Sequence, residues 1–223
     1  MRRLVIVRPE PGASASVDHA RALIGIDAFA MPLFAVEPVA WAVPDPREFD
    51  ALLLTSANAV RQGGEGLAQL RGLPVYAVGE ATAATAREAG FEVAGTGDAG
   101  VDALLSSIPG RVRLLHLCGE HRTAAAVANA VPVYRSVELP TPDDLGQIEG
   151  QTVAVHSPRA GQRMAELVDR AGIDRATIRI AAISEAVALA TGEGWAMREA
   201  AETPTEAALL ALAARLCDNP GTT

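Results

Sequence analysis

Short apolar runs alternate with alanine-rich segments along almost the whole chain, and this alternation restricts the fold more than any other feature. Runs such as Ala51–Leu54 and Thr152–His156 are apolar on both faces, as expected of strands that helices cover on either side. Between them, Arg159–Ala171 places its apolar residues on one helical stripe. The pattern predicts an α/β protein whose parallel sheets are built from strand–helix–strand units.

The regular alternation breaks at two places, which indicates two lobes rather than one large sheet. Residues 34–46 and 131–142 are rich in proline and extended, and they read as long strands that cross between lobes. We therefore expect two small doubly wound lobes with a cleft between them. Lobe 1 is predicted to span 1–35 and 140–223, and lobe 2 to span 40–131, with connectors at about 36–39 and 132–139. The predicted strands are Leu4–Val7, Ala28–Pro32, Ala51–Leu54, Pro74–Val78, Glu92–Ala94, Arg113–Leu117, Val131–Val137, Thr152–His156, Arg179–Ile183 and Met197–Ala200.

Composition excludes several classes of function. The chain has 19 basic and 27 acidic residues among 223, so it lacks the basic surface that nucleic acids and anionic membranes require. Every basic residue is arginine, which rules out Schiff-base lysines and phosphate-binding loops that need lysine. Cys118 and Cys217 form no metal-binding or disulfide pattern, and no apolar stretch has the length of a membrane span. A reducing cytoplasm is the expected compartment.

Hydroxyl or small residues follow many predicted strands at the point where a helix begins. Ser56, Ser157 and Ser184 are examples, and the stretch from Thr203 to Glu206 has the pattern of a capping box. Because parallel strands end at one edge of a sheet, these helix starts should gather there and present backbone N–H groups to anions. The sequence therefore predicts a site for a ligand with many carboxylates.

Other motifs carry less weight. Gly95–Gly100 matches the GxGxxG pattern of dinucleotide-binding proteins, but its strand is short and is not the first of its lobe, so we interpret it as a turn. The histidines have no metal-ligand spacing, and we expect His116 and His156 to be packed in strands. Tyr134 lies in the second connector, where its hydroxyl could donate a proton to a ligand.

Eight segments together resemble the uroporphyrinogen-III synthase family. They are VRPEPGA (Val7–Ala13), LLLTSANAV (Leu52–Val60), PVYAVGEATA (Pro74–Ala83), LLHLCGEHR (Leu114–Arg122), VYRSVE (Val133–Glu138), VHSPRA (Val155–Ala160), AISEAVA (Ala182–Ala188) and PTEAALLAL (Pro204–Leu212). The resemblance covers nearly the full chain, and the order and spacing of the segments carry it.

The resemblance implies a lyase of heme biosynthesis that uses neither a metal nor an organic cofactor. Such an enzyme closes linear hydroxymethylbilane to uroporphyrinogen III, with loss of water and inversion of the last pyrrole ring through a spiro intermediate. A monomer is expected, with transient contact to hydroxymethylbilane synthase. Two other functions stay open: a non-catalytic protein that binds a tetrapyrrole or a small anion, and a nucleotide-dependent oxidoreductase.

The resemblance also assigns site residues. It makes Tyr134 the candidate proton donor. The residues implied to bind substrate are Arg8, Ser56, Asn58, Gly79, Thr82, Gly119, Arg122, Ser157 and Ser184. One departure from the family pattern is that Ala186 and Val187 stand where some members have threonines, which leaves Ser184 as the hydroxyl of that turn.

Overall fold

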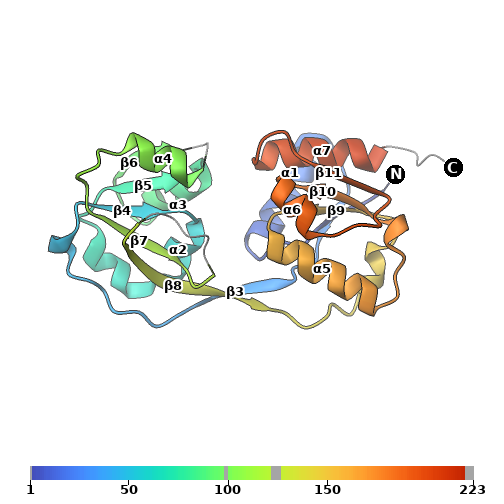
Figure 1. Cartoon of the computed structure of the whole chain (residues 1–223), viewed down its shortest axis with the longest axis horizontal. Coiled ribbons are helices and arrows are strands. Elements are labelled where there is room, and N and C mark those ends of the chain that lie inside the picture. Colours follow the sequence, from blue (N-terminus) through green and yellow to red (C-terminus); the bar gives the residue numbers. More distant parts are fainter. Residues whose placement is uncertain (1, 98–99, 122–126, 219–223) are drawn as a thin grey trace. The chain divides into compact units, whose positions relative to one another are not determined.

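The computed structural model describes residues 2–97, 100–121 and 127–218. The chain divides into two compact units, each with its own sheet. Unit 1 consists of Met1–Ala35 and Glu138–Thr223, and unit 2 of Val36–Val137. Figure 1 labels most of the helices and strands of both units. None of the helices in the described ranges combines the length and apolar character needed to cross a membrane.

The sheet of unit 1 has five parallel strands in the order β11-β10-β9-β1-β2. Their bounds are β1 (Leu4–Ile6), β2 (Ala28–Ala30), β9 (Thr152–Val155), β10 (Arg179–Ala182) and β11 (Met197–Ala200). The first strand of the chain thus pairs directly with β9, which follows the whole of unit 2 in sequence.

Helices cover both faces of this sheet. They are α1 (Gly12–Ile24), α5 (Pro158–Arg170), α6 (Glu185–Ala190) and α7 (Glu206–Asp218), with 3-10 turns η3 (Leu145–Ile148) and η4 (Arg175–Thr177). Alternate strand residues face opposite sides: Val5 and Ile180 pack with α5 and α6, while Leu4 and Ala181 pack with α1 and α7. This two-sided burial explains why the central strands β1 and β9 are largely apolar, while the edge strand β11 is only half buried and contains Arg198 and Glu199.

The sheet of unit 2 has six strands in the order β3-β8-β7-β4-β5-β6. Their bounds are β3 (Phe34–Pro38), β4 (Ala51–Leu54), β5 (Val75–Val78), β6 (Val93–Gly97), β7 (Leu114–Gly119) and β8 (Asn129–Glu138). The pairs from β8 through β6 are parallel. Backbone hydrogen bonds from Val39 N to Val133 O and from Leu139 N to Leu33 O have the spacing of an antiparallel β3–β8 pair.

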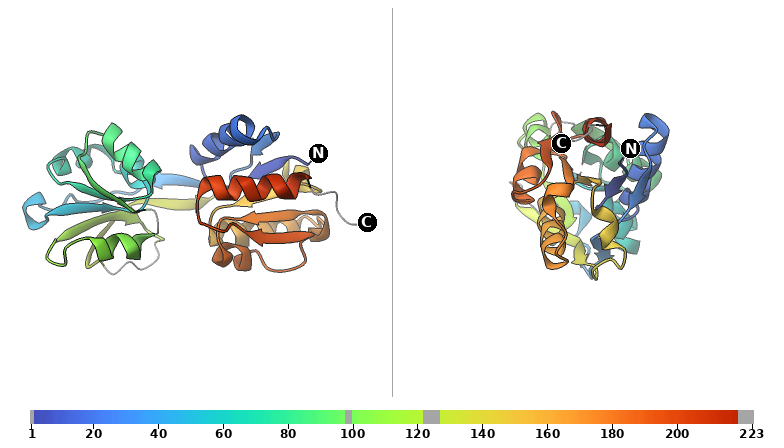
Figure 2. Two further views of the ribbon diagram at one scale, coloured as in Figure 1. Left: turned by 90° about the horizontal axis from the view of Figure 1, so that it is seen from above. Right: turned by 90° about the vertical axis from the view of Figure 1, so that its right-hand side faces the viewer.

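Helices also lie on both faces of this second sheet. They are α2 (Ala57–Gln62), α3 (Glu80–Glu88) and α4 (Val101–Ser107), with 3-10 segments η1 (Pro46–Glu48) and η2 (Gly64–Leu70). One core, which includes Leu52 and Leu115, packs with α2 and α3, and a smaller one around Leu53 packs with α4. The left view of Figure 2 shows α3 and α4 on opposite sides of the sheet. These parallel, helix-covered sheets confirm the predicted fold class.

Two local predictions are wrong. Thr205, and not Thr203, accepts the capping hydrogen bond at the start of α7, from Ala208 N at 3.3 Å, and Glu206 is the first residue of that helix. The carboxylate of Glu206 therefore does not complete a capping box.

The GxGxxG segment is not simply a turn, because its first two glycines lie in β6. A Cβ atom added to Gly95 would come within 2.9 Å of the Tyr76 ring, so the glycine allows strand and ring to approach closely. Gly100 precedes α4 with φ of 92°, a conformation that favours glycine. These roles are structural.

Candidate active site

Each sheet has one point where its strand order reverses direction. In unit 1 the chain leaves β1 toward β2 on one side and leaves β9 toward β10 on the other. In unit 2 the same reversal lies between β4 and β7. Ligands of parallel α/β sheets bind beyond the carboxyl ends of the strands at such a point, because the helices there diverge and leave room.

The switch point of unit 2 brings together three of the predicted site residues. Ser56 follows β4, Gly119 ends β7, and Tyr134 lies opposite Gly119 in the register of β7 with β8. A Cβ atom on Gly119 would lie 2.8 Å from Tyr134 Cε2 and 3.2 Å from its hydroxyl oxygen. The phenol ring therefore rests on the backbone of Gly119, at a place where only glycine leaves space for it.

Ser56 is the polar neighbour that acts on the Tyr134 hydroxyl. Burial raises the pKa of Tyr134 above its ordinary value of 10; Ser56 opposes this increase, and the nearby Cys118 adds to it. The side chain is thus a neutral phenol at physiological pH, with a proton to donate and a neighbouring hydroxyl to steady the phenolate that donation leaves.

Ser56 is held in place by the start of α2. Its Oγ accepts a hydrogen bond from Asn58 N at 3.2 Å, which fixes the side chain while its own proton stays available. The preceding Thr55 bonds through Oγ1 to His116 Nε2 at 3.1 Å. His116 is 1% exposed, which confirms that it is packed inside its strand.

The β5–α3 turn contributes Gly79 and Thr82 to the same edge of the sheet. Gly79 has φ of 79° and precedes α3 without a side-chain cap, so the first N–H groups of the helix have no side-chain partner there. Thr82 is only 5% exposed, and its hydroxyl therefore presents little surface to a ligand. Arg122 lies outside the described residues.

The switch point of unit 1 places Arg8 just after β1 and His156 just after β9. Arg8 Nη1 donates to Glu206 Oε2 at 3.1 Å and to Ser16 Oγ at 3.3 Å. The same Glu206 oxygen is 2.9 Å from His156 Nε2. The sequence analysis expected His156 to be packed within its strand; its side chain is largely buried, at 9% exposed, but the residue lies just after β9, and the contact with Glu206 was missed. One feature of the sequence could have indicated the contact between His156 and Glu206: each of them follows a strand, although they lie 50 positions apart.

Comparison with protein families identifies the chain. A family model described as uroporphyrinogen-III synthase HemD matches residues 19–211. The chain belongs to the uroporphyrinogen-III synthase family. It is accordingly an enzyme of heme biosynthesis, as the sequence segments predicted. No curated protein sequence matches the chain.

Solved uroporphyrinogen-III synthases share the fold. The crystal structure of uroporphyrinogen-III synthetase from Helicobacter pylori 26695 matches with a TM-score of 0.65 at 19% identity, covering 97% of this chain and 100% of that one. A mutant uroporphyrinogen III synthase from the extremely thermophilic bacterium Thermus thermophilus matches with a TM-score of 0.53 at 17% identity, covering 98% of this chain and 100% of that one.

Ser157 and Ser184 occupy equivalent helix starts in this uroporphyrinogen-III synthase family member but use their hydroxyls differently. Ser157 Oγ accepts from Ala160 N at 3.2 Å and caps α5. Ser184 precedes α6 in the same extended conformation but makes no side-chain cap. The hydroxyl of Ser184 therefore does not cap the helix, and the neighbouring Glu185 is exposed. Of the two serines, Ser184 thus has the hydroxyl that is not engaged in capping.

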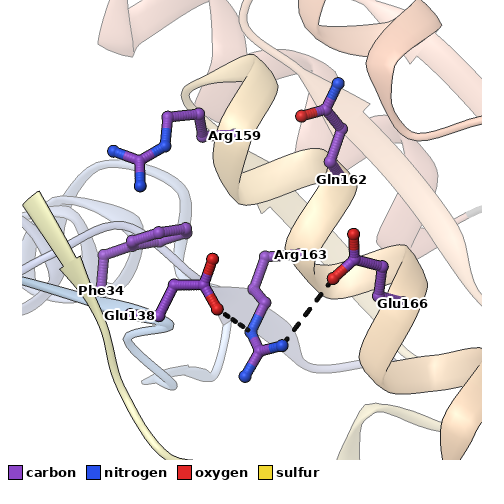
Figure 3. Close-up of a pocket in the computed structure, with 6 residues that line it drawn as sticks. All are labelled: Phe34, Glu138, Arg159, Gln162, Arg163 and Glu166. Atoms are coloured by element: carbon purple, nitrogen blue, oxygen red, sulfur yellow. Dashed lines mark ion pairs between the residues drawn. The ribbon is translucent and has the colours of Figure 1, made fainter. Parts of the chain in front are cut away.

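A hollow of about 70 Å³ opens along one side of α5 (Figure 3). Arg159 lies over the Phe34 ring at 4.8 Å, and Arg163 faces Glu138 at 3.5 Å and Glu166 at 3.8 Å. Because two guanidinium groups are offset by two carboxylates, the hollow has no excess of positive charge. It is therefore a poorer carboxylate site than the switch point. No group of metal-binding side chains occurs among the described residues of this family member.

Proposed function

We propose that the protein is a uroporphyrinogen-III synthase that closes linear hydroxymethylbilane to uroporphyrinogen III, with inversion of ring D. Family membership supports this activity, and the observation that carries the chemical step is the position of the Tyr134 phenol against Gly119, at the switch point where Ser56 follows β4. Without an enzyme, hydroxymethylbilane closes head to tail and gives the uninverted isomer I. The protein must therefore favour one transition state over a competing one.

In the proposed mechanism Tyr134 is the proton donor for the first step. Its hydroxyl proton passes to the leaving hydroxyl of ring A, the C–O bond breaks, and water departs. The substrate becomes an azafulvenium cation, and the phenolate of Tyr134 remains beside Ser56. The phenolate is then a base of raised pKa, which suits it to recover a proton at the end of the reaction.

The remaining steps exchange carbon–carbon bonds and require positioning rather than further acids. The substituted carbon of ring D attacks the ring A methylene and forms a spiro intermediate. The bond from that carbon to the bridge from ring C breaks, and the bridge rejoins ring D at its other α-carbon. Loss of the proton there restores the pyrrole and returns Tyr134 to its neutral form. Overall, one water molecule is released.

Substrate carboxylates are proposed to bind at the carboxyl edges of the two sheets. Arg8 provides a guanidinium group at one switch point, and Ser184 provides a hydroxyl on the same sheet. The N–H groups that follow Gly79 provide donors at the other sheet. This arrangement allows a protein of net charge −8 to bind an anionic ligand, because local donors rather than the overall charge face it.

An isomer ratio tests the proposal directly. Hydroxymethylbilane is generated from porphobilinogen by hydroxymethylbilane synthase, the protein is added, and the products are oxidised and separated by chromatography. A change from uroporphyrin I to uroporphyrin III is the expected result. Uroporphyrin I alone, from folded protein, would refute catalysis.

Transient contact with hydroxymethylbilane synthase and a monomeric state are further expectations. Sedimentation of each protein alone and of their mixture measures both.

A further inference from the structure

The contacts around Arg8 come from four segments of unit 1. Arg8 follows β1, Ser16 lies in α1, His156 follows β9, and Glu206 begins α7. Ser16 is 1% exposed, and the His156 side chain is 9% exposed, so two of the three groups behind Arg8 are buried. Three segments thus surround the guanidinium group of Arg8 at a switch point: Ser16 and Glu206 bond to it directly, and His156 contacts it through Glu206. This is a built arrangement, unlike an ordinary surface ion pair.

The carboxylate of Glu206 is directed inward. Its Oε2 accepts from Arg8 and contacts His156 Nε2, and its Oε1 is buried. Arg8 keeps 35% of its side chain exposed, and Glu206 keeps 27%. Because Glu206 Oε1 is buried and Oε2 contacts Arg8 and His156, the carboxylate oxygens are turned toward the cluster, and Arg8 is its more exposed charged side chain.

Gly12 packs directly against the guanidinium group of Arg8. A Cβ atom at this first residue of α1 would lie 2.6 Å from Arg8 Nε, 2.9 Å from Cζ and 3.0 Å from Nη2. The guanidinium group thus occupies the space that any other side chain at position 12 would fill. Among the described residues, Arg8 makes hydrogen bonds only through Nη1, which leaves its Nε–Nη2 edge unbonded.

We propose that Glu206 and His156 are positioning residues, which hold Arg8 over Gly12 so that its Nε–Nη2 edge binds a carboxylate of the tetrapyrrole. Planar guanidinium edges bind carboxylates through two parallel hydrogen bonds, and a fixed guanidinium loses less freedom on binding than a mobile one. The inference rests on the proposed function for the identity of the ligand. Glu206 and His156 act through Arg8 and do not themselves touch the substrate.

The test uses uroporphyrin III, a stable polycarboxylate, as a probe whose binding is followed by fluorescence. This readout does not depend on turnover, so failure of the isomer assay and failure of this inference remain distinguishable. For Glu206→Gln we expect the Kd to rise about 5- to 10-fold. If Glu206 only offset the charge of Arg8, the same change would tighten binding, because the probe is an anion. A lower or unchanged Kd therefore overturns the proposal.

Gly12→Ala is the second variant, and it leaves every charge in place. The added methyl group meets the end of a flexible side chain, so Arg8 must shift while the fold is kept. We expect a rise in Kd comparable to that of Glu206→Gln, with no loss of thermal stability. In an Arg8→Met background neither change should weaken binding further, because both act through Arg8. Additive effects in that background would overturn the inference.

The matched control is Glu199→Gln, which removes another glutamate that pairs with an arginine of unit 1. Glu199 contacts Arg215 at 3.3 Å, and both side chains are well exposed. Its loss should leave the Kd for uroporphyrin III unchanged. An equal effect from this control would mean that overall charge, and not the positioning of Arg8, governs binding. Absence of uroporphyrin III binding by the unaltered protein would likewise overturn the inference.

Discussion

Replacing Tyr134 with phenylalanine removes one oxygen atom and leaves the ring on Gly119. If the phenol protonates the leaving hydroxyl, we expect the rate of uroporphyrinogen III formation to fall by about 100-fold, a usual contribution of a positioned general acid. The unfolding temperature should hardly change. Initial rates of isomer III formation, with circular dichroism as a check of folding, measure both quantities.

Tyr76→Phe is the matched control for that variant. Tyr76 belongs to the same sheet but packs in the core beside α4, away from the switch point. Its rate should stay within about 2-fold of the unaltered protein, since most substitutions outside a site change activity little. Equal losses in both variants would assign the effect of Tyr134→Phe to packing.

His156 makes the stability of the protein dependent on pH. Burial lowers the pKa of His156 below 6.5, and this effect exceeds the opposing influence of Glu206. The unfolded chain therefore binds the proton more tightly, so stability is complete above pH 6.5 and declines as the pH falls below it. We expect His156→Asn to show a smaller decline between pH 7.5 and 5.5 in urea unfolding. The exposed His19→Asn should leave the slope unchanged, and an unchanged slope in His156→Asn would contradict the assignment.

Individual residues differ in how well sequence alone predicts their roles. Tyr134 could be proposed because it lies in the predicted second connector and matches a tyrosine of the family pattern; its role as a proton donor stays a prediction. Glu206 could not, because the local pattern from Thr203 to Glu206 fits a capping box, while its actual partners lie 50 and 198 positions away. A local sequence pattern indicates which neighbouring groups can form hydrogen bonds. It does not show which distant side chain forms the bond in the folded protein.

At the scale of elements, the serines before α5 and α6 allow a paired comparison. Ser157→Ala removes the cap of α5 and should cost about 1 kcal/mol of stability, while isomer III formation falls less than 10-fold because the backbone N–H groups remain. Ser184→Ala removes no cap and should change stability by less than about 0.5 kcal/mol. Urea unfolding and initial rates test both. Abolished activity in Ser157→Ala, or a larger stability loss in Ser184→Ala, would contradict this view.

Strand cores were predictable, and strand ends were less so. Ala51–Leu54 and Met197–Ala200 were predicted with the bounds that the structure shows. Apolar residues on both faces define the first as a buried strand, whereas the second is a half-buried edge strand that the alternation of strands and helices indicated. Glu92–Ala94 was predicted too short: β6 continues through Gly95 and Gly97, where glycine normally indicates a turn. There the Tyr76 ring fills the space that side chains would occupy, a tertiary contact that the local sequence does not contain.

At the scale of the whole molecule, unit 2 contains complete cores of its own. We expect a fragment of residues 34–139 to fold with one cooperative urea transition and a stability of about 5 kcal/mol. The same fragment with Leu52→Asp, which buries a charge in its core, should be unfolded. Circular dichroism measures both. An unfolded unaltered fragment would show that unit 2 depends on unit 1.

The position of β9 between β1 and β10 also sets an order of events during synthesis. On the ribosome, β1 and β2 emerge before unit 2, yet the strand that pairs with the other edge of β1 is made only after the whole of unit 2. Because synthesis adds about 5–20 residues per second, this edge of β1 stays without its partner strand β9 for many seconds. Unit 2 is a continuous segment and can fold in that interval. A strand that is translated before unit 2 thus obtains its second neighbour only after unit 2 has been made.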